Sequence, residues 1–140
     1  MNIDSIHNGF VIDHITAGQG MRLYDLLGLD KLTVPVAIRQ NVSSGKMGKK
    51  DIIKIDADIP VDLDVIGFVD PHVTINIIKN EALVEKRRIE LPARIVNVLR
   101  CKNPRCITST EQELDHVFEL TDPVKKVYRC AYCETAHKDP

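Results

Sequence analysis

The sequence predicts an α+β protein in two parts: an N-terminal antiparallel sheet with two helices (a ferredoxin-like sandwich), and a small C-terminal all-β zinc ribbon of the rubredoxin-like type. Residues 1–92 contain short Ile- and Val-rich runs separated by turn signals, and no Cys. All four Cys of the 140-residue chain come later. Pro92 restricts the conformation of Leu91, so we place the boundary there and expect domains at 1–92 and 93–140.

The expected elements follow from local patterning. Two helices are expected in the first part: one capped by Thr16 and ended by Gly28, and one opened by Pro60, with Val65 and Val69 on its apolar side. Residues 43–48 read as a hairpin loop between two strands. Strands are expected over residues 9–15, 33–42, 51–56, 72–78 and 82–86 in the first part, and over 95–99, 117–120 and 127–129 in the second.

Composition excludes several classes of protein. The formal net charge is -1, and residues 93–140 carry 8 Lys and Arg against 7 Asp and Glu, too near neutral for phosphate-driven binding of nucleic acid. No apolar run reaches the roughly 18 residues of a membrane-spanning helix. The N-terminus lacks the basic and then apolar order of a signal peptide. We therefore expect a cytoplasmic protein with no membrane or nucleic-acid partner.

The four cysteines have the spacing of a metal site. Cys101 and Cys106 enclose four residues, Cys130 and Cys133 enclose two, and 23 residues separate the pairs. Each pair can reach one ion from a tight loop, and four sulfur ligands leave no open position, which predicts one structural Zn²⁺. About 48 residues are too few to be stable through apolar burial alone, so the metal would support folding. The alternatives are four unrelated buried or redox cysteines, or iron.

Residues 1–92 contain no sequence motif that by itself identifies a binding or catalytic site. The loop from Ser44 to Lys50 contains two Gly-Lys-type steps but lacks the spacing of a Walker phosphate loop, which favours a solvated basic hairpin. Asp13 and His14 are adjacent in an expected strand, so their side chains should point to opposite faces. Lys54 and Lys86 lie in strands, where a lysine either binds an anion or marks a solvated edge.

Taken together, the chain resembles the regulatory chain of aspartate carbamoyltransferase, an enzyme of pyrimidine biosynthesis. The resemblance covers essentially the whole chain in order. The segments that carry it are Gly9–Ile15, Ser44–Ile55, Ala93–Leu99, Cys101–Cys106 and Tyr128–Glu134.

The resemblance implies a non-catalytic subunit with a nucleotide-binding N-terminal domain. CTP, UTP and ATP would be its allosteric effectors. By matching position, Asp13 and Lys54 would contact the ribose and base, His14 and Lys86 the phosphates with Lys50 close by, and Asn76 and the backbone of Leu83 would line the pocket. Glu81 stands where some members of the family have an aromatic residue.

The resemblance also implies partners. The zinc domain would dock on the catalytic chain, and regulatory chains would form dimers, three of which link two catalytic trimers. Residues that flank the thiolates are the candidates for the docking surface: Asn103, Arg105, Tyr132 and Glu134. Two other functions remain open from the residues alone, a zinc-ribbon nucleic-acid-binding protein and an enzyme that uses Asp13 and His14.

Overall fold

A computed structural model of the chain describes residues 6–137. The chain divides into two compact units, Met1–Glu90 and Leu91–Pro140, called here the N-terminal and C-terminal units. Residues 1–5, which contributed to the expectation that there is no signal peptide, lie outside the described residues. Within the described residues, no helix combines the length and apolar character needed to cross a membrane.

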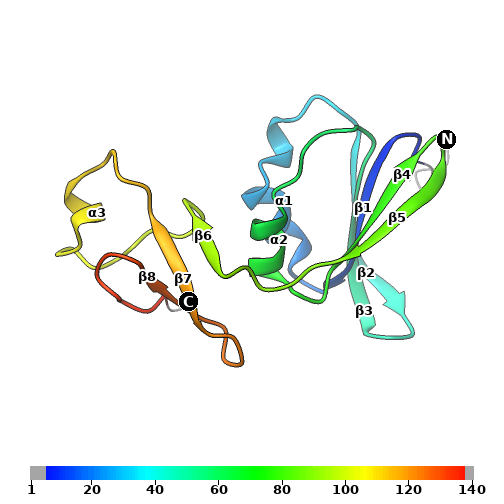
Figure 1. Cartoon of the computed structure of the whole chain (residues 1–140). Coiled ribbons are helices and arrows are strands. Elements are labelled where there is room, and N and C mark those ends of the chain that lie inside the picture. The colour runs from blue at the N-terminus through cyan, green and yellow to red at the C-terminus, as the bar shows by residue number, and fades with distance from the viewer. Residues whose placement is uncertain (1–5, 138–140) are drawn as a thin grey trace. The chain divides into compact units, whose positions relative to one another are not determined.

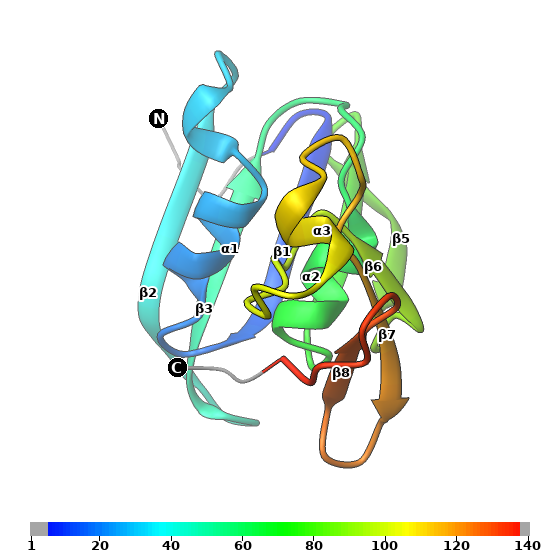
Figure 2. The ribbon, with the colours of Figure 1, turned by 90° about the vertical axis from the view of Figure 1, so that its left-hand side faces the viewer.

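The N-terminal unit is a five-stranded sheet with two helices on one side (Figure 1). The strand order is β2-β3-β1-β4-β5, and all neighbours are antiparallel. The helices α1 and α2 lie on the same face of the sheet, which Figure 2 views from the side of the helices. The elements are β1 (Gly9–Thr16), α1 (Gly20–Leu26), the 3-10 turn η1 (Leu29–Lys31), β2 (Val36–Ser44), β3 (Gly48–Ile55), α2 (Leu63–Val69), β4 (Thr74–Lys79) and β5 (Ala82–Arg88).

The helix-covered face of this sheet holds the core of the N-terminal unit. Ile12, Ile53 and Ile75 lie side by side on β1, β3 and β4, and Ile12 and Ile53 are fully buried. Leu23 of α1 and Ile66 of α2 are also fully buried. Because strand residues alternate between faces, residues 11, 54 and 76 lie on the other face, which no described helix of this unit covers. The half-buried Val11, Lys54 and Asn76 therefore lie on this open face of the sheet.

Both helices begin later than the sequence predicts. Thr16 is the last residue of β1 and not a helix cap, and α1 begins after Gln19, which makes no side-chain cap. Pro60 precedes α2, which begins after Asp62 because the Asp62 carboxylate accepts hydrogen bonds from the backbone N–H groups of Asp64 (3.1 Å) and Val65 (3.2 Å). The predicted stop at Gly28 agrees with the end of α1 at Leu26 and with the positive φ of Gly28 (66°).

The C-terminal unit is a three-stranded antiparallel sheet with the order β6-β7-β8. Its elements are β6 (Arg94–Val96), α3 (Ile107–Thr110), β7 (Val117–Asp122) and β8 (Val127–Cys130). The expected strand 95–99 is shorter than predicted, because Asn97 adopts a positive φ of 58° that ends β6. The single helical turn α3 was not predicted.

A small apolar core supports the sheet of the C-terminal unit. Ile95, Phe118 and Tyr128 are almost completely buried, one on each strand. The Tyr128 hydroxyl donates a hydrogen bond of 2.7 Å to the carbonyl of Pro92 and so satisfies its polar group within the core. The predicted fold class, an α+β unit followed by a small β unit with clustered cysteines, is confirmed.

Candidate metal centre and candidate nucleotide site

The four cysteines converge on one point in the C-terminal unit. Their sulfur atoms all lie within 4.8 Å of one another. Cys101 Sγ is 3.5 Å from Cys133 Sγ, and Cys106 Sγ is 3.7 Å from Cys130 Sγ. Four thiolates at the usual Zn–S length of about 2.3 Å stand about 3.8 Å apart in a regular tetrahedron. The donor set therefore fits one tetrahedral, closed and hence structural Zn²⁺, which confirms the predicted metal site.

Backbone hydrogen bonds fold each cysteine pair into a tight loop. In the first loop, Cys106 N donates to the Asn103 carbonyl (3.0 Å), and Asn103 Oδ1 accepts from Arg105 N (3.0 Å). In the second, Glu134 N donates to the Cys130 carbonyl (2.9 Å), and Glu134 adopts a positive φ of 65°. These contacts hold both thiols of a pair on one side of the loop.

The surroundings of the sulfur atoms affect how readily they ionise. Burial raises the pKa of the Cys101 thiol to about 12, and burial also raises the pKa of Cys130. Hydrogen bonding with Thr135 lowers the pKa of Cys133 to about 6; the Thr135 hydroxyl lies 3.2 Å from its sulfur. Because a metal binds thiolates, loading the site displaces protons from the buried thiols. When bound, the ion supplies a cross-link between the two loops.

The candidate docking residues differ in how much of their side chain is available. Arg105, Tyr132 and Glu134 are exposed to solvent, and the exposed fraction of Tyr132 is 48%. Asn103 is half-buried, and its amide also donates to Thr135 Oγ1 (3.3 Å). Asn103 thus braces the cysteine loops, whereas the side chains of the other three residues are exposed, and their part in docking stays a prediction.

The open face of the N-terminal sheet lines up three of the predicted nucleotide-binding residues. Lys54 on β3 is paired with Val11 on β1, Val11 with Asn76 on β4, and Asn76 with Lys86 on β5. Directly paired residues share a face of a sheet, so Lys54, Asn76 and Lys86 lie in one row across it. Leu83 lies further along β5, opposite Ile78.

Asn76 has a buried polar atom without a hydrogen-bond partner in the described part of the chain. Its Oδ1 is buried and has no hydrogen-bond partner among the described residues. Buried amide oxygens in proteins almost always have a partner in protein, ligand or water. An orphaned acceptor in the middle of a row with lysines on both sides is therefore suited to a polar ligand that brings donors of its own.

A β-bulge places Asp13 and His14 on the same face of the sheet, although they are adjacent. The pairing of β1 with β3 shifts between Ile12 and Ile15, and His14 has a positive φ of 59°. His14 Nδ1 lies 2.8 Å from Thr74 Oγ1, and Thr74 is the direct pairing partner of Asp13. The expectation that these side chains point to opposite faces was therefore wrong, because the bulge interrupts the alternation.

Asp13 forms an ion pair with Lys50. Lys50 Nζ lies 2.9 Å from Asp13 Oδ1, and both side chains are more than four-fifths buried. Burial would raise the pKa of Asp13, but the hydrogen bond from Lys50, together with that from the backbone of His14, outweighs it and leaves the pKa below its usual value. Asp13 is therefore ionised at neutral pH and can accept hydrogen bonds from hydroxyl groups.

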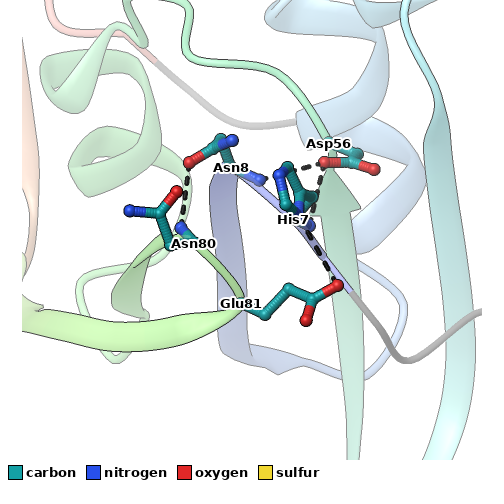
Figure 3. Close-up of polar contacts among 5 residues, drawn as sticks. All are labelled: His7, Asn8, Asp56, Asn80 and Glu81. Carbon is teal, nitrogen blue, oxygen red and sulfur yellow. Dashed lines mark hydrogen bonds and ion pairs between the residues drawn. The ribbon is translucent and has the colours of Figure 1, made fainter.

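The turn between β4 and β5 is tied to the segment that precedes β1 (Figure 3). Asp56 Oδ1 accepts from the backbone N–H groups of His7 (3.1 Å) and Asn8 (3.3 Å), and Asn8 Oδ1 accepts from Asn80 N (3.0 Å). The Glu81 carboxylate lies 3.5 Å from His7 Nδ1. The Glu81 side chain is thus directed at a histidine on the neighbouring segment.

Asp51 is a supporting residue that sequence reasoning missed. Its side chain is fully buried, and its two oxygens accept hydrogen bonds of 3.0 Å from the backbone N–H groups of Gly18, Gly20 and Asn41. These contacts fix the start of α1 and the irregular middle of β2 next to Lys50. The only sequence signal is an acid at the edge of an apolar run, which is not diagnostic.

Comparison with known proteins covers both units. The family model described as "Aspartate carbamoyltransferase regulatory chain, allosteric domain" matches residues 1–90, and the one described as "Aspartate carbamoyltransferase regulatory chain, metal binding domain" matches residues 93–140. Curated proteins named aspartate carbamoyltransferase regulatory chain are similar over almost the full length. That of Clostridium botulinum (strain Hall) is 49% identical over 134 residues, 96% of this chain and 92% of the relative. That of Clostridium tetani is 48% identical (99% and 96% covered), and that of Bifidobacterium longum 39% (99% of each).

Proposed function

Because this chain belongs to the aspartate carbamoyltransferase regulatory chain family, we propose that it is the allosteric subunit that carries a nucleotide signal to the catalytic chain. It is a regulatory and not a catalytic chain. Nucleoside triphosphates (CTP, UTP and ATP) would bind the open face of the N-terminal sheet. The metal-bound C-terminal unit would dock on the catalytic chain.

The row Lys54, Asn76 and Lys86 is the observation that carries the nucleotide site. It combines two cations with a buried acceptor that lacks a partner, on a face with no helix of its own unit over it. Asp13 and His14 extend the same face toward Thr74. Phosphate oxygens would meet dispersed cations there in place of a glycine-rich loop, and the ionised Asp13 would accept from ribose hydroxyls.

Regulation requires that the nucleotide distinguish two quaternary states. A ligand shifts such an equilibrium only by the difference between its affinities for the two states, typically about 1–3 kcal/mol of coupling. We propose that the chain forms the assembly that the resemblance implies, in which regulatory chains form dimers and three dimers connect two catalytic trimers. The exposed Arg105, Tyr132 and Glu134, with Asn103 bracing the loops, would belong to the docking surface.

A zinc-ribbon nucleic-acid-binding protein is not favoured. The part of the chain that holds the cysteines is close to neutral, and both units match a metabolic regulatory chain. An enzyme based on Asp13 and His14 is not supported either. Asp13 is engaged with Lys50 and with the backbone of His14, and the His14 ring is bonded to Thr74.

The direct test is reconstitution. The purified chain is mixed with catalytic trimers, and carbamoyl transfer to aspartate is measured with and without CTP, UTP and ATP. We expect a complex on size-exclusion chromatography and a change in activity with at least one nucleotide, and neither effect with trimers alone. If there is neither a complex nor a nucleotide effect, the proposal is wrong.

A Lys86→Ala variant is expected to lose the nucleotide response and keep assembly. Removing one charge-assisted contact to phosphate should weaken nucleotide binding about ten- to a hundredfold. Binding is measured by calorimetry and assembly by size exclusion. Lys79→Ala is the matched control, because Lys79 is also exposed but lies at the far end of β4. Loss of assembly in Lys86→Ala would contradict the proposal that the N-terminal unit binds nucleotide while the C-terminal unit docks on the catalytic chain.

A further inference from the structure

The segment that joins the two units is short and largely buried. β5 ends at Arg88, the N-terminal unit ends at Glu90, and β6 of the C-terminal unit begins at Arg94. Ile89 and Pro92 are buried, although neither belongs to a strand or a helix. Connections between domains are usually exposed and flexible. The burial of this connection therefore indicates that it is held in place.

The first anchor of the segment lies within the N-terminal unit. A Cβ placed on Gly67 of α2 would collide with the carbonyl oxygen of Glu90 and would lie 2.9 Å from Cγ2 of Ile89. The backbone at this point therefore runs directly against the helix, in a space that only a glycine leaves open. Because Arg88 is still paired with β4, the segment is fixed to the sheet at its start and to α2 directly afterwards.

The second anchor lies within the C-terminal unit. The Tyr128 hydroxyl donates its hydrogen bond of 2.7 Å to the carbonyl of Pro92, and Tyr128 is 1% exposed. The next carbonyl, that of Ala93, accepts a hydrogen bond of 2.9 Å from Leu120 N on β7. Tyr128 lies on β8, two residues before the metal ligand Cys130. The end of the segment is therefore tied to the two strands next to the metal site.

A single residue, Leu91, lies between the two anchored carbonyls. Because peptide bonds are planar, one residue supplies only two soft backbone dihedral angles. Such a connection passes on most of a displacement and absorbs little of it. Lys86, in the proposed nucleotide row, is four residues before Glu90 on the strand that leads into the segment. A shift of β5 on nucleotide binding would thus reach Pro92 through the main chain.

We propose that residues 89–92 carry the nucleotide signal from the N-terminal sheet to the metal-binding unit, and that Gly67 and Tyr128 are the positioning residues that hold this segment. The inference rests on the proposed function and adds the path by which regulation leaves the nucleotide site. Neither residue belongs to the proposed nucleotide site or to the candidate docking surface. Their replacement should therefore change the size of the response and leave binding and assembly in place.

The test measures binding, assembly and response separately. Tyr128→Phe keeps the ring in the core and removes the hydrogen bond to Pro92, and Gly67→Ala places a methyl group against Glu90. We expect nucleotide affinity by calorimetry on the full chain to change less than about twofold, and co-elution with catalytic trimers to persist. In the reconstituted assembly, the ratio of carbamoyl-transfer activities with and without nucleotide should move toward one by about twofold or more.

Two substitutions of the same kind serve as controls. Tyr24→Phe also removes a phenol hydroxyl, one that makes no hydrogen bond within the described residues. Gly45→Ala also adds a methyl group, in the turn between β2 and β3, where a Cβ would have no atom within 4 Å. Both controls should respond to nucleotide as the unaltered chain does. Zinc content and far-ultraviolet circular dichroism establish that each variant is folded, and if one anchor variant does not fold, the other decides.

The outcomes separate this inference from the proposed function. If the unaltered assembly shows no nucleotide response, the proposed function is wrong, and the inference with it. If the unaltered assembly responds and a folded anchor variant responds to the same extent, the segment does not carry the signal, while the proposed function stands. Loss of response that is explained by lost nucleotide affinity or lost assembly, or an equal loss in the controls, would likewise overturn the inference.

Discussion

Removal of the metal ion is expected to unfold the C-terminal unit and to separate the chain from its catalytic partner. The unit has about 50 residues and only a small core around Ile95, Phe118 and Tyr128. Binding of structural zinc contributes roughly 10–16 kcal/mol in small zinc domains at neutral pH, more than such a core supplies. The N-terminal unit has its own sheet and core and should stay folded.

The measurement combines assembly with local structure. A mercurial reagent followed by a chelator releases the metal, and size exclusion with catalytic trimers reports assembly. Hydrogen exchange should show loss of protection in β7 and β8 and retained protection in β1 and β3. Restoring Zn²⁺ after reduction of the thiols should restore the complex, and Co²⁺ should give the absorption of a tetrahedral sulfur site.

The catalytic trimers provide the internal control. They should remain active after the treatment and lose only their response to nucleotide. If regulatory and catalytic chains still migrate together after complete loss of metal, the metal does not organise the docking surface, and this part of the proposal fails.

Replacement of Asp51 by Ala is expected to destabilise the N-terminal unit by about 2–5 kcal/mol. The change leaves the N–H groups of Gly18, Gly20 and Asn41 without their acceptor inside the protein. Water cannot readily replace the lost carboxylate, because the side chain is fully buried.

Asp56→Ala is the matched control for this prediction. Asp56 also accepts two backbone hydrogen bonds, from His7 and Asn8, but at a half-buried position where water can replace it. We expect it to cost about 1 kcal/mol. Stability is measured by urea denaturation followed by far-ultraviolet circular dichroism, with hydrogen exchange to assign the transition to the N-terminal unit. Equal destabilisation by the two substitutions would contradict the role assigned to Asp51.

The metal ligands could be predicted because their signal is local. Two short cysteine loops are recognisable from spacing alone, and the sulfur atoms meet as expected. The strands were also predicted in kind, since alternating Ile and Val define a buried face wherever the strand pairs. The starts of α1 and α2 were misplaced, because Thr16 continues a strand and Asp62, not Pro60, caps the second helix.

The sequence by itself determined the fold class, the metal ligands and the family. Only the tertiary structure decided how the candidate nucleotide-binding residues are arranged. The row of Lys54, Asn76 and Lys86 depends on the register between strands distant along the chain, which no local pattern specifies. The shared face of Asp13 and His14 depends on a bulge in β1. The role of Asp51 depends on three backbone N–H groups that come from two segments distant from it in the sequence. The physical reason is the same in each case, because pairing and burial between remote segments become visible only once the chain is folded.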